Sequence, residues 1–131
     1  QDRRQRQMCI RDSIGNPHCV VLVKNLKLIK LNMLGPLLVK NKLFPDQANI
    51  TFVEVLKKSK VKVLFWERGG GHTLACGSGT CATAFVLNHN DFVSSKIKVV
   101  TERSVLKTEI KDKMVFLQGP AELVYQSSIN I

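Results

Sequence analysis

Apolar and polar positions vary along the chain in short runs that are separated by turn residues. Most runs are rich in Val, Ile and Phe, which is typical of strands. One stretch differs, because leucines recur at helical spacing between Leu28 and Leu38. Gly35-Pro36 interrupts this stretch, which predicts a short or broken helix. Strands are expected at 19–23, 50–56, 61–66, 97–101, 105–110 and 114–117, with a last strand near 122–125.

A glycine-rich loop precedes the second predicted helix. Gly69-Gly70-Gly71 is followed by Gly77 and Gly79, and residues 80–87 then lack glycine and proline and contain alanines. The runs at 50–56 and 61–66 flank a lysine-rich turn, so we expect them to form a hairpin. Many strands, about two helices and local strand pairing predict an α+β domain with a largely antiparallel or mixed sheet.

Composition narrows the class of protein. The chain has 131 residues, of which 44% are hydrophobic and 23% are charged, and this favours one globular domain over a disordered segment. No apolar run approaches the roughly 18 to 20 residues that a membrane-spanning helix needs. The net charge of +10 suggests a polyanionic partner. However, the lysines are dispersed and aromatic residues make up only 6%, so solvated surfaces are favoured over a nucleic-acid site.

The first residues differ in composition from the rest of the chain. Four of the six arginines lie within residues 3–11, whereas lysine dominates afterwards. We therefore expect residues 1–13 to be a foreign basic leader outside the fold and residues 14–131 to form the domain. No secretory signal is visible, so a cytoplasmic location is expected.

Cysteine spacing argues against a metal site. Cys9, Cys19, Cys76 and Cys81 fit neither a paired zinc-ligand motif nor a small disulfide scaffold. In a reducing cytoplasm the four cysteines are predicted to be free thiols, and no metal is expected.

The segment 66–81 carries the most chemical information: Trp-Glu-Arg-Gly-Gly-Gly-His-Thr-Leu-Ala-Cys-Gly-Ser-Gly-Thr-Cys. It places Cys76 at the start of a predicted helix, where unpaired N–H groups and the helix dipole favour a thiolate. The glycines let a ligand approach the backbone, and Ser78 and Thr80 offer hydroxyl groups. A lone cysteine in an alanine-rich helix is more often a small buried apolar residue. The flanking glycines shift the balance towards a functional thiol.

This segment resembles the signature of the diaminopimelate epimerases, the amino-acid epimerases of lysine and peptidoglycan precursor synthesis. The resemblance implies a domain with a curved mixed or antiparallel sheet wrapped around a central helix. It extends over nearly everything from residue 14 onward. The further blocks, in family order, are Gly15-Asn16-Pro17-His18-Cys19-Val20, Leu34-Gly35-Pro36-Leu37-Leu38, Leu43-Phe44-Pro45, Asn49-Ile50-Thr51-Phe52-Val53 and Gly119-Pro120-Ala121-Glu122.

The activity that the resemblance implies is the epimerisation of LL-2,6-diaminopimelate to meso-diaminopimelate without pyridoxal phosphate or another cofactor. In this family one cysteine removes the α-proton and a second cysteine supplies a proton to the opposite face. Cys76 matches the cysteine of the C-terminal half, and no second suitable Cys-Gly-Asn-Gly pattern is present. The chain thus resembles the C-terminal half of the enzyme, and the missing N-terminal domain is expected to supply the second cysteine. A homodimer is compatible with this interpretation.

The resemblance also assigns roles by position. Catalytic roles fall on Cys76, on His18, which tunes the cysteine pair, and on Glu67, which lies near the thiols. Arginine can hold a carboxylate through two hydrogen bonds, glutamate can pair with an ammonium group, and backbone groups at the helix start can neutralise the α-carboxylate. For Asn16 and Asn49, an ordinary role in a turn is about as compatible with the sequence as substrate binding. The substrate-binding set is Asn16, Asn49, Glu67, Arg68, Gly77 and Ser78.

One residue departs from the family pattern, and several other functions stay open. His72 stands where the family has glutamate in Gly-x-Gly-Glu-Thr, and we expect it to alter the loop's charge without abolishing function. The chain is alternatively a truncated, non-catalytic fragment or a binding module of the same fold. Proline racemases and phenazine-type isomerases share a related architecture, but Glu67-Arg68 favours diaminopimelate. A nucleic-acid-binding protein is the least favoured class.

Overall fold

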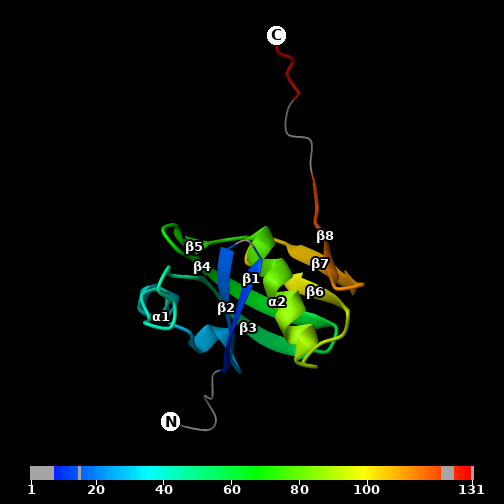
Figure 1. The fold of residues 1–131 in the computed structure, drawn as a ribbon. Coiled ribbons are helices and arrows are strands. Elements are labelled where there is room, and N and C mark those ends of the chain that lie inside the picture. The colour runs from blue at the N-terminus through cyan, green and yellow to red at the C-terminus, as the bar shows by residue number, and fades with distance from the viewer. Residues whose placement is uncertain (1–7, 15, 122–125, 131) are drawn as a thin grey trace.

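The computed structural model describes residues 8–14, 16–121 and 126–130, with side chains from Pro17 onward. The strands and helices follow one another as an α+β domain, with one short 3-10 helix, η2 (Figure 1). In chain order they are β1 (Met8–Ile14), β2 (Asn16–Leu22), η2 (Leu26–Leu28), α1 (Leu31–Val39), β3 (Asn49–Lys57), β4 (Lys60–Glu67), β5 (Gly71–Thr73), α2 (Gly77–His89), β6 (Lys96–Val100), β7 (Val105–Lys111) and β8 (Met114–Gln118).

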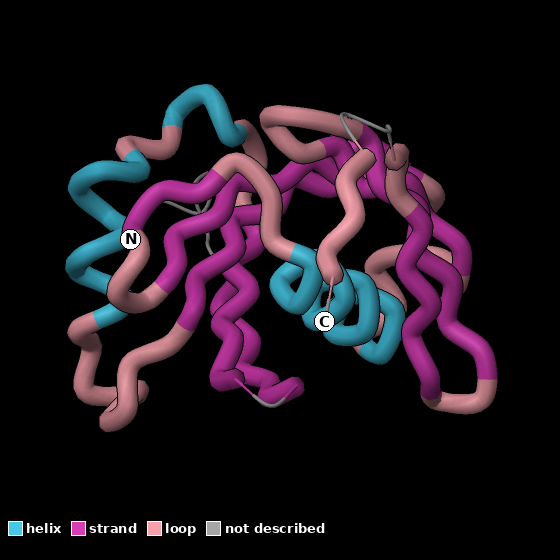
Figure 2. The backbone as a smooth tube through the Cα atoms, turned by 90° about the horizontal axis from the view of Figure 1, so that it is seen from above, coloured by secondary structure: helices cyan, strands magenta, loops and turns pink. Residues whose placement is uncertain are grey.

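The strands form one mixed sheet in the order β1-β2-β3-β4-β6-β7-β8, and β5 pairs with β4. The β2–β3 and β4–β6 pairs are parallel, whereas the other pairs are antiparallel. The sheet curls around α2, so that β1 and β8, at the two ends of the strand order, both contact this helix (Figures 1 and 2). The predicted fold class, a curved mixed sheet around a central helix, is confirmed.

Two hydrophobic cores lie on opposite faces of the sheet. Successive side chains of β4 point to opposite faces and so belong to different cores. Val61, Val63 and Phe65 face α2, whereas Leu64 and Trp66 lie in the second core. The second core is closed by the segment between β2 and β3, which includes η2 and α1. On β6 and β7, the face that points away from α2 carries the lysines at 96, 98 and 107. All three lysines are exposed.

The segment between β2 and β3 forms a short helix, which is the first of the two predicted outcomes, and the Gly35-Pro36 pair does not break it. Pro36 lies inside α1, and its carbonyl accepts a hydrogen bond from the Lys40 N–H. Packing explains why the helix persists, because Gly35 is buried against the indole of Trp66. Tertiary packing therefore outweighs the helix-breaking tendency of this pair.

The boundary expected after residue 13 does not hold for residues 8–13. These residues belong to β1, which pairs with β2 from Met8↔Leu22 to Ile14↔Asn16. Main-chain hydrogen bonds to β2 do not depend on the basic composition that set this segment apart. Residues 1–7 and the strand expected near 122–125 lie outside the described residues. Among the described helices, none combines the length and apolar character needed to cross a membrane.

A substitution tests the contact between α1 and β4. A Cβ atom at Gly35 would overlap the Trp66 ring, whereas at Gly70 its nearest neighbour would be Glu67 Oε2 at 3.5 Å. We expect Gly35→Ala to lower the free energy of unfolding by about 1 to 3 kcal/mol because the core would be overpacked. Gly70→Ala, the control, should change it by less than about 0.5 kcal/mol. Urea unfolding measures both, and equal effects would contradict the packing account.

Candidate functional site

Cys76 is the residue that begins α2. It is the N-cap, with an extended backbone, and its Sγ accepts a hydrogen bond from the Gly79 N–H at 3.3 Å. Its carbonyl accepts a hydrogen bond from the Thr80 N–H at 3.0 Å and another from the Thr80 hydroxyl at 2.7 Å. The thiol is therefore held at the open end of the helix, in a half-buried position.

Small residues make this position of the thiol possible. A Cβ atom at Gly79 would lie 3.1 Å from Phe65 Cε1 and 3.2 Å from Cys76 Sγ, so a larger residue would press on the ring and the thiol. Ser78 Oγ lies 3.5 Å from the sulfur. At Gly77 a Cβ atom would stand 3.6 Å from Leu117 Cδ2, so β8 also approaches the helix start.

Burial raises the pKa of the Cys76 thiol above its usual value. Hydrogen bonds from Ser78 and the Gly79 N–H act in the opposite direction, while the Glu67 carboxylate raises the pKa further. The prediction of a favoured thiolate is therefore wrong for this chain, because desolvation outweighs the helix start. The pKa of Cys81 is also raised, chiefly by burial and then by the charge on Cys76.

The ends of two strands bring further polar residues to this region. Asn49 begins β3 and Glu67 ends β4, its antiparallel neighbour. The Arg68 N–H donates to Asn49 Oδ1 at 2.9 Å, and Arg68 Nη1 donates to the Asp46 carbonyl at 2.8 Å. Glu67 also raises the pKa of the Cys76 thiol. The residues at these strand ends therefore lie close to the start of α2.

The remaining predicted residues come from β2 and α2. His18 is fully buried and lies beside Asn49 in the parallel β2–β3 register. Asn16 begins β2, but its side chain is outside the described part of the structure. The structure thus gathers Cys76, Gly77, Ser78, Glu67, Arg68 and Asn49 into one region and places His18 on the neighbouring strand.

Some contacts of the site come from residues that sequence reasoning did not select. His72 pairs in β5 with Trp66, and its Nε2 lies 2.5 Å from Glu102 Oε1. The Glu102 carboxylate therefore faces the residue that departs from the family pattern. The Asp46 carbonyl and the Leu117 side chain are the other unselected neighbours. They lie in loops or strands remote in sequence, and no local motif marks them.

The expectation that all four cysteines are free thiols is wrong. Cys76 and Cys81 are free, whereas Cys19 is disulfide-bonded. Sequence spacing did not reveal this bond, because the chain separation of two cysteines does not give their distance in the fold. Within the described residues, no group of three or more His, Cys, Asp or Glu side chains is placed to hold a metal ion.

Two solved structures have the same arrangement of elements. They are phenazine biosynthesis proteins of the PhzF type, from Enterococcus faecalis and Clostridium difficile, and each has a TM-score of 0.60. The sequences are 19% and 22% identical, over 75% and 77% of this chain and 35% and 36% of those chains. At this identity the likeness defines the fold class alone, a domain of the type found in PhzF-like proteins.

Sequence comparison defines the family. The diaminopimelate epimerase family model matches residues 12–124, and the chain belongs to this family. The diaminopimelate epimerase of Methanococcus maripaludis is 37% identical over 121 residues, which are 91% of this chain and 44% of that protein. The enzyme of Carboxydothermus hydrogenoformans is 40% identical over 115 residues, or 87% and 42% of the two chains. The chain spans less than half the length of these relatives.

The influence of Glu67 on the thiol can be tested by alkylation. Glu67→Gln removes a charge that raises the pKa of Cys76, so more thiolate should form at pH 8. We expect iodoacetamide to alkylate Cys76 roughly two- to tenfold faster, as followed by mass spectrometry in a Cys81→Ala background.

Glu102→Gln provides the control, because it removes the same charge from a carboxylate that faces His72 instead. Its alkylation rate should match that of the background variant. If Glu67→Gln leaves the rate unchanged, the carboxylate does not act on Cys76.

Proposed function

We propose that this chain is the C-terminal half of an enzyme that converts LL-2,6-diaminopimelate to meso-diaminopimelate by two-cysteine acid/base catalysis, in lysine and peptidoglycan precursor biosynthesis. The observation that carries the proposal is the thiol of Cys76 at the start of α2, beside Glu67. Family membership and the partial coverage of the relatives support it. In this assignment the C-terminal domain includes β1 and so begins before residue 14.

The chemistry requires two groups on opposite faces of the α-carbon. A base on the missing N-terminal domain takes the α-proton, and the electron pair is delocalised into the α-carboxylate. The Cys76 thiol then donates its proton to the other face and becomes a thiolate. A raised pKa suits this step, because it keeps the thiol protonated near neutral pH. In the reverse direction the Cys76 thiolate accepts the proton.

The rest of the site binds and orients the substrate. N–H groups at the start of α2, at Gly77 and Ser78, are suited to the α-carboxylate, because the first turn of a helix leaves its donors unpaired. Neutralising this carboxylate lowers the cost of forming the carbanion. Arg68 and Glu67 match the distal carboxylate and ammonium groups of diaminopimelate in charge.

Amide groups and a buried imidazole complete the proposed set. Asn49 Oδ1 holds the Arg68 backbone, so this asparagine also fixes the end of β4. We assign Asn16 to hydrogen bonding with the substrate. His18 acts as a positioning residue that tunes the cysteine pair from the neighbouring strand. The reaction needs no cofactor in this scheme.

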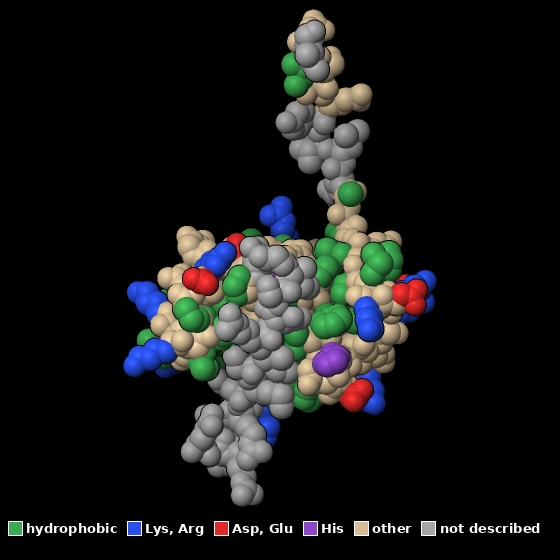
Figure 3. Space-filling view, in the orientation of Figure 1, with side chains coloured by type: hydrophobic (Ala, Val, Ile, Leu, Met, Phe, Trp, Pro, Cys, Tyr) green, Lys and Arg blue, Asp and Glu red, His purple; other side chains and the backbone are tan. Residues whose placement is uncertain are grey.

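Exposed apolar surface around the helix start (Figure 3) supports the need for a partner domain. Leu74 is 48% exposed and Leu117 is 43% exposed, and the two residues flank the segment that carries Cys76. Such surface is stabilised when a second domain covers it. We propose that the N-terminal domain does so and supplies the second cysteine, in a cytoplasmic enzyme that is compatible with a homodimer.

A second candidate is a non-catalytic fragment or binding module of the same fold. The second free thiol, Cys81, favours this alternative, because it lies five residues beyond Cys76, in the first half of the helix that Cys76 caps. Two thiols on one helix are not placed on opposite faces of a substrate carbon. The isolated chain is therefore expected to lack epimerase activity.

Exchange of the α-proton tests the proposed function. The chain is incubated with meso-diaminopimelate in D2O under reducing conditions, alone and mixed with the N-terminal half of the Methanococcus maripaludis enzyme. We expect NMR to detect α-deuterium only in the mixture, since each half supplies one acid/base group.

Two variants identify the group that acts. Cys76→Ala should abolish exchange in the mixture, whereas Cys81→Ala should retain most of it. Exchange by the isolated chain would contradict the half-site account. A complex that forms without exchange would favour the binding module.

A further inference from the structure

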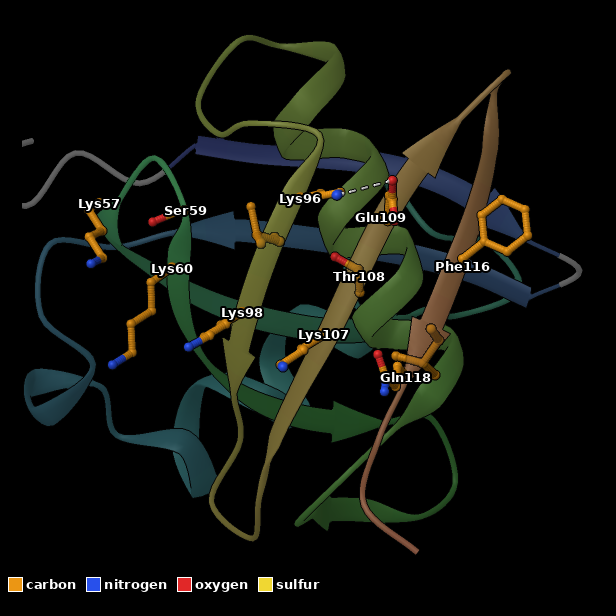
Figure 4. Close-up of a pocket in the computed structure, with 12 residues that line it drawn as sticks. Lys57, Ser59, Lys60, Lys96, Lys98, Lys107, Thr108, Glu109, Phe116 and Gln118 are labelled. Atoms are coloured by element: carbon orange, nitrogen blue, oxygen red, sulfur yellow. Dashed lines mark ion pairs between the residues drawn. The ribbon is translucent and has the colours of Figure 1, made fainter.

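The lysines that are dispersed in the sequence gather at one pocket on the sheet. The pocket has a volume of about 510 Å³ and is lined by residues of β4, β6, β7 and β8, of the turn before β4 and of the end of β3 (Figure 4). Its basic residues are Lys57, Lys60, Lys96, Lys98 and Lys107. A volume of this size is typical of small-molecule sites, which measure roughly 300 to 1,000 Å³.

Strand register aligns three of these lysines. Lys60 is opposite Lys98 in the β4–β6 pair, and Lys98 is opposite Lys107 in the β6–β7 pair. Because neighbouring strands are about 4.8 Å apart, the row extends over about 10 Å. Like charges in directly opposite positions destabilise a sheet, so this row has an energetic cost in the free protein. Figure 4 shows the three side chains side by side on one face.

Acidic residues do not neutralise the row. Glu109 is the one carboxylate of the pocket lining, and its Oε1 already lies 3.8 Å from Lys96 Nζ and 3.3 Å from Lys111 Nζ. Among the described residues, no carboxylate lies within ion-pairing distance of Lys60, Lys98 or Lys107. The row therefore presents several uncompensated positive charges to any molecule in the pocket.

The pocket is separate from the region around Cys76. Ile97 and Val99 of β6 face α2, so Lys96 and Lys98, which alternate with them, point to the opposite side of the sheet. A ligand of the lysine pocket would thus leave the proposed catalytic region open.

We propose that this pocket binds a small ligand that carries a run of phosphate groups, such as an inorganic oligophosphate or a nucleoside triphosphate. The phosphates of such a chain are dense enough to contact all three lysines within about 10 Å, each lysine acting as a point charge. Carboxylates on alternate residues of an extended peptide are about 6.6 Å apart, so fewer of them match the row. A single-stranded nucleic acid stacks its bases on several aromatic rings, and the pocket lining offers Phe116 alone.

The test compares two variants that lose the same charge. The first replaces Lys60, Lys98 and Lys107 with Gln. The second replaces three exposed lysines outside the pocket with Gln, namely Lys24, Lys40 and Lys42 in the segment between β2 and β3. Titration calorimetry measures the binding of inorganic tripolyphosphate at fixed ionic strength. We expect the row variant to bind about tenfold or more weakly than the unaltered chain, and the control to stay within about twofold.

Further probes identify the source of the phosphate chain. Adenosine triphosphate that binds more tightly than tripolyphosphate would indicate a nucleotide, whereas the reverse would indicate the inorganic chain. Equal losses in the two triple variants would overturn the proposal, because net charge alone would then govern binding. A glutamate-rich peptide or a single-stranded oligonucleotide that binds more tightly than either phosphate, and only to the intact row, would overturn it in favour of a macromolecular partner.

Folding of the row variant is checked independently. Removing three opposed like charges should leave the thermal unfolding temperature unchanged or higher in the free protein. If the triple variant fails to fold, Lys98→Gln alone removes the central charge of the row and should weaken tripolyphosphate binding by about threefold or more. Unchanged binding by a folded Lys98→Gln chain would contradict the proposal.

Discussion

The packing of α2 inside the curled sheet is the constraint on which the rest of the structure depends. Seven of the thirteen helix residues are buried, and most of them are small: Gly79, Thr80, Ala82, Thr83, Ala84, Val86 and Leu87. Small side chains let the helix lie close to strands on several sides, so the sheet has to curve to cover it. This closeness fixes the start of the helix against Phe65 and therefore sets the position of Cys76.

The order of the strands in the sheet brings the ends of β2, β3 and β4 to the region around Cys76. The parallel pairing of β2 with β3 places His18 beside Asn49, and the antiparallel pairing of β3 with β4 brings Glu67 and Arg68 to the same end. Three separate parts of the chain, namely β2, the β3–β4 hairpin and the start of α2, thus contribute to one site. The thiol is partly desolvated there, and burial decides its pKa against the opposing effect of the helix N–H groups.

Local patterns predicted much of this arrangement. The apolar runs predicted the strands from β2 to β8 apart from the three-residue β5, and the glycine-rich loop predicted the helix that begins at Gly77. Patterns failed where tertiary contacts decide the outcome. The leucine pattern left a short and a broken helix open, and the burial of Gly35 on Trp66 decides for the short helix. Likewise, β1 joins the sheet through main-chain bonds that composition does not reveal. The lysine row was hidden for a similar reason, because register alone aligns residues 60, 98 and 107.

The central claim is that Cys76 reaches one face of a substrate carbon while a second domain supplies the opposite face. The most direct test is a crystal structure of this chain joined to the N-terminal half of a relative, with meso-diaminopimelate bound. The account predicts that Cys76 Sγ lies about 3.5 Å from an α-carbon, with the α-carboxylate on the N–H groups at the start of α2 and the partner's thiol on the opposite face. An α-carbon beyond the reach of Cys76, or one that contacts Cys81 instead, would contradict the claim.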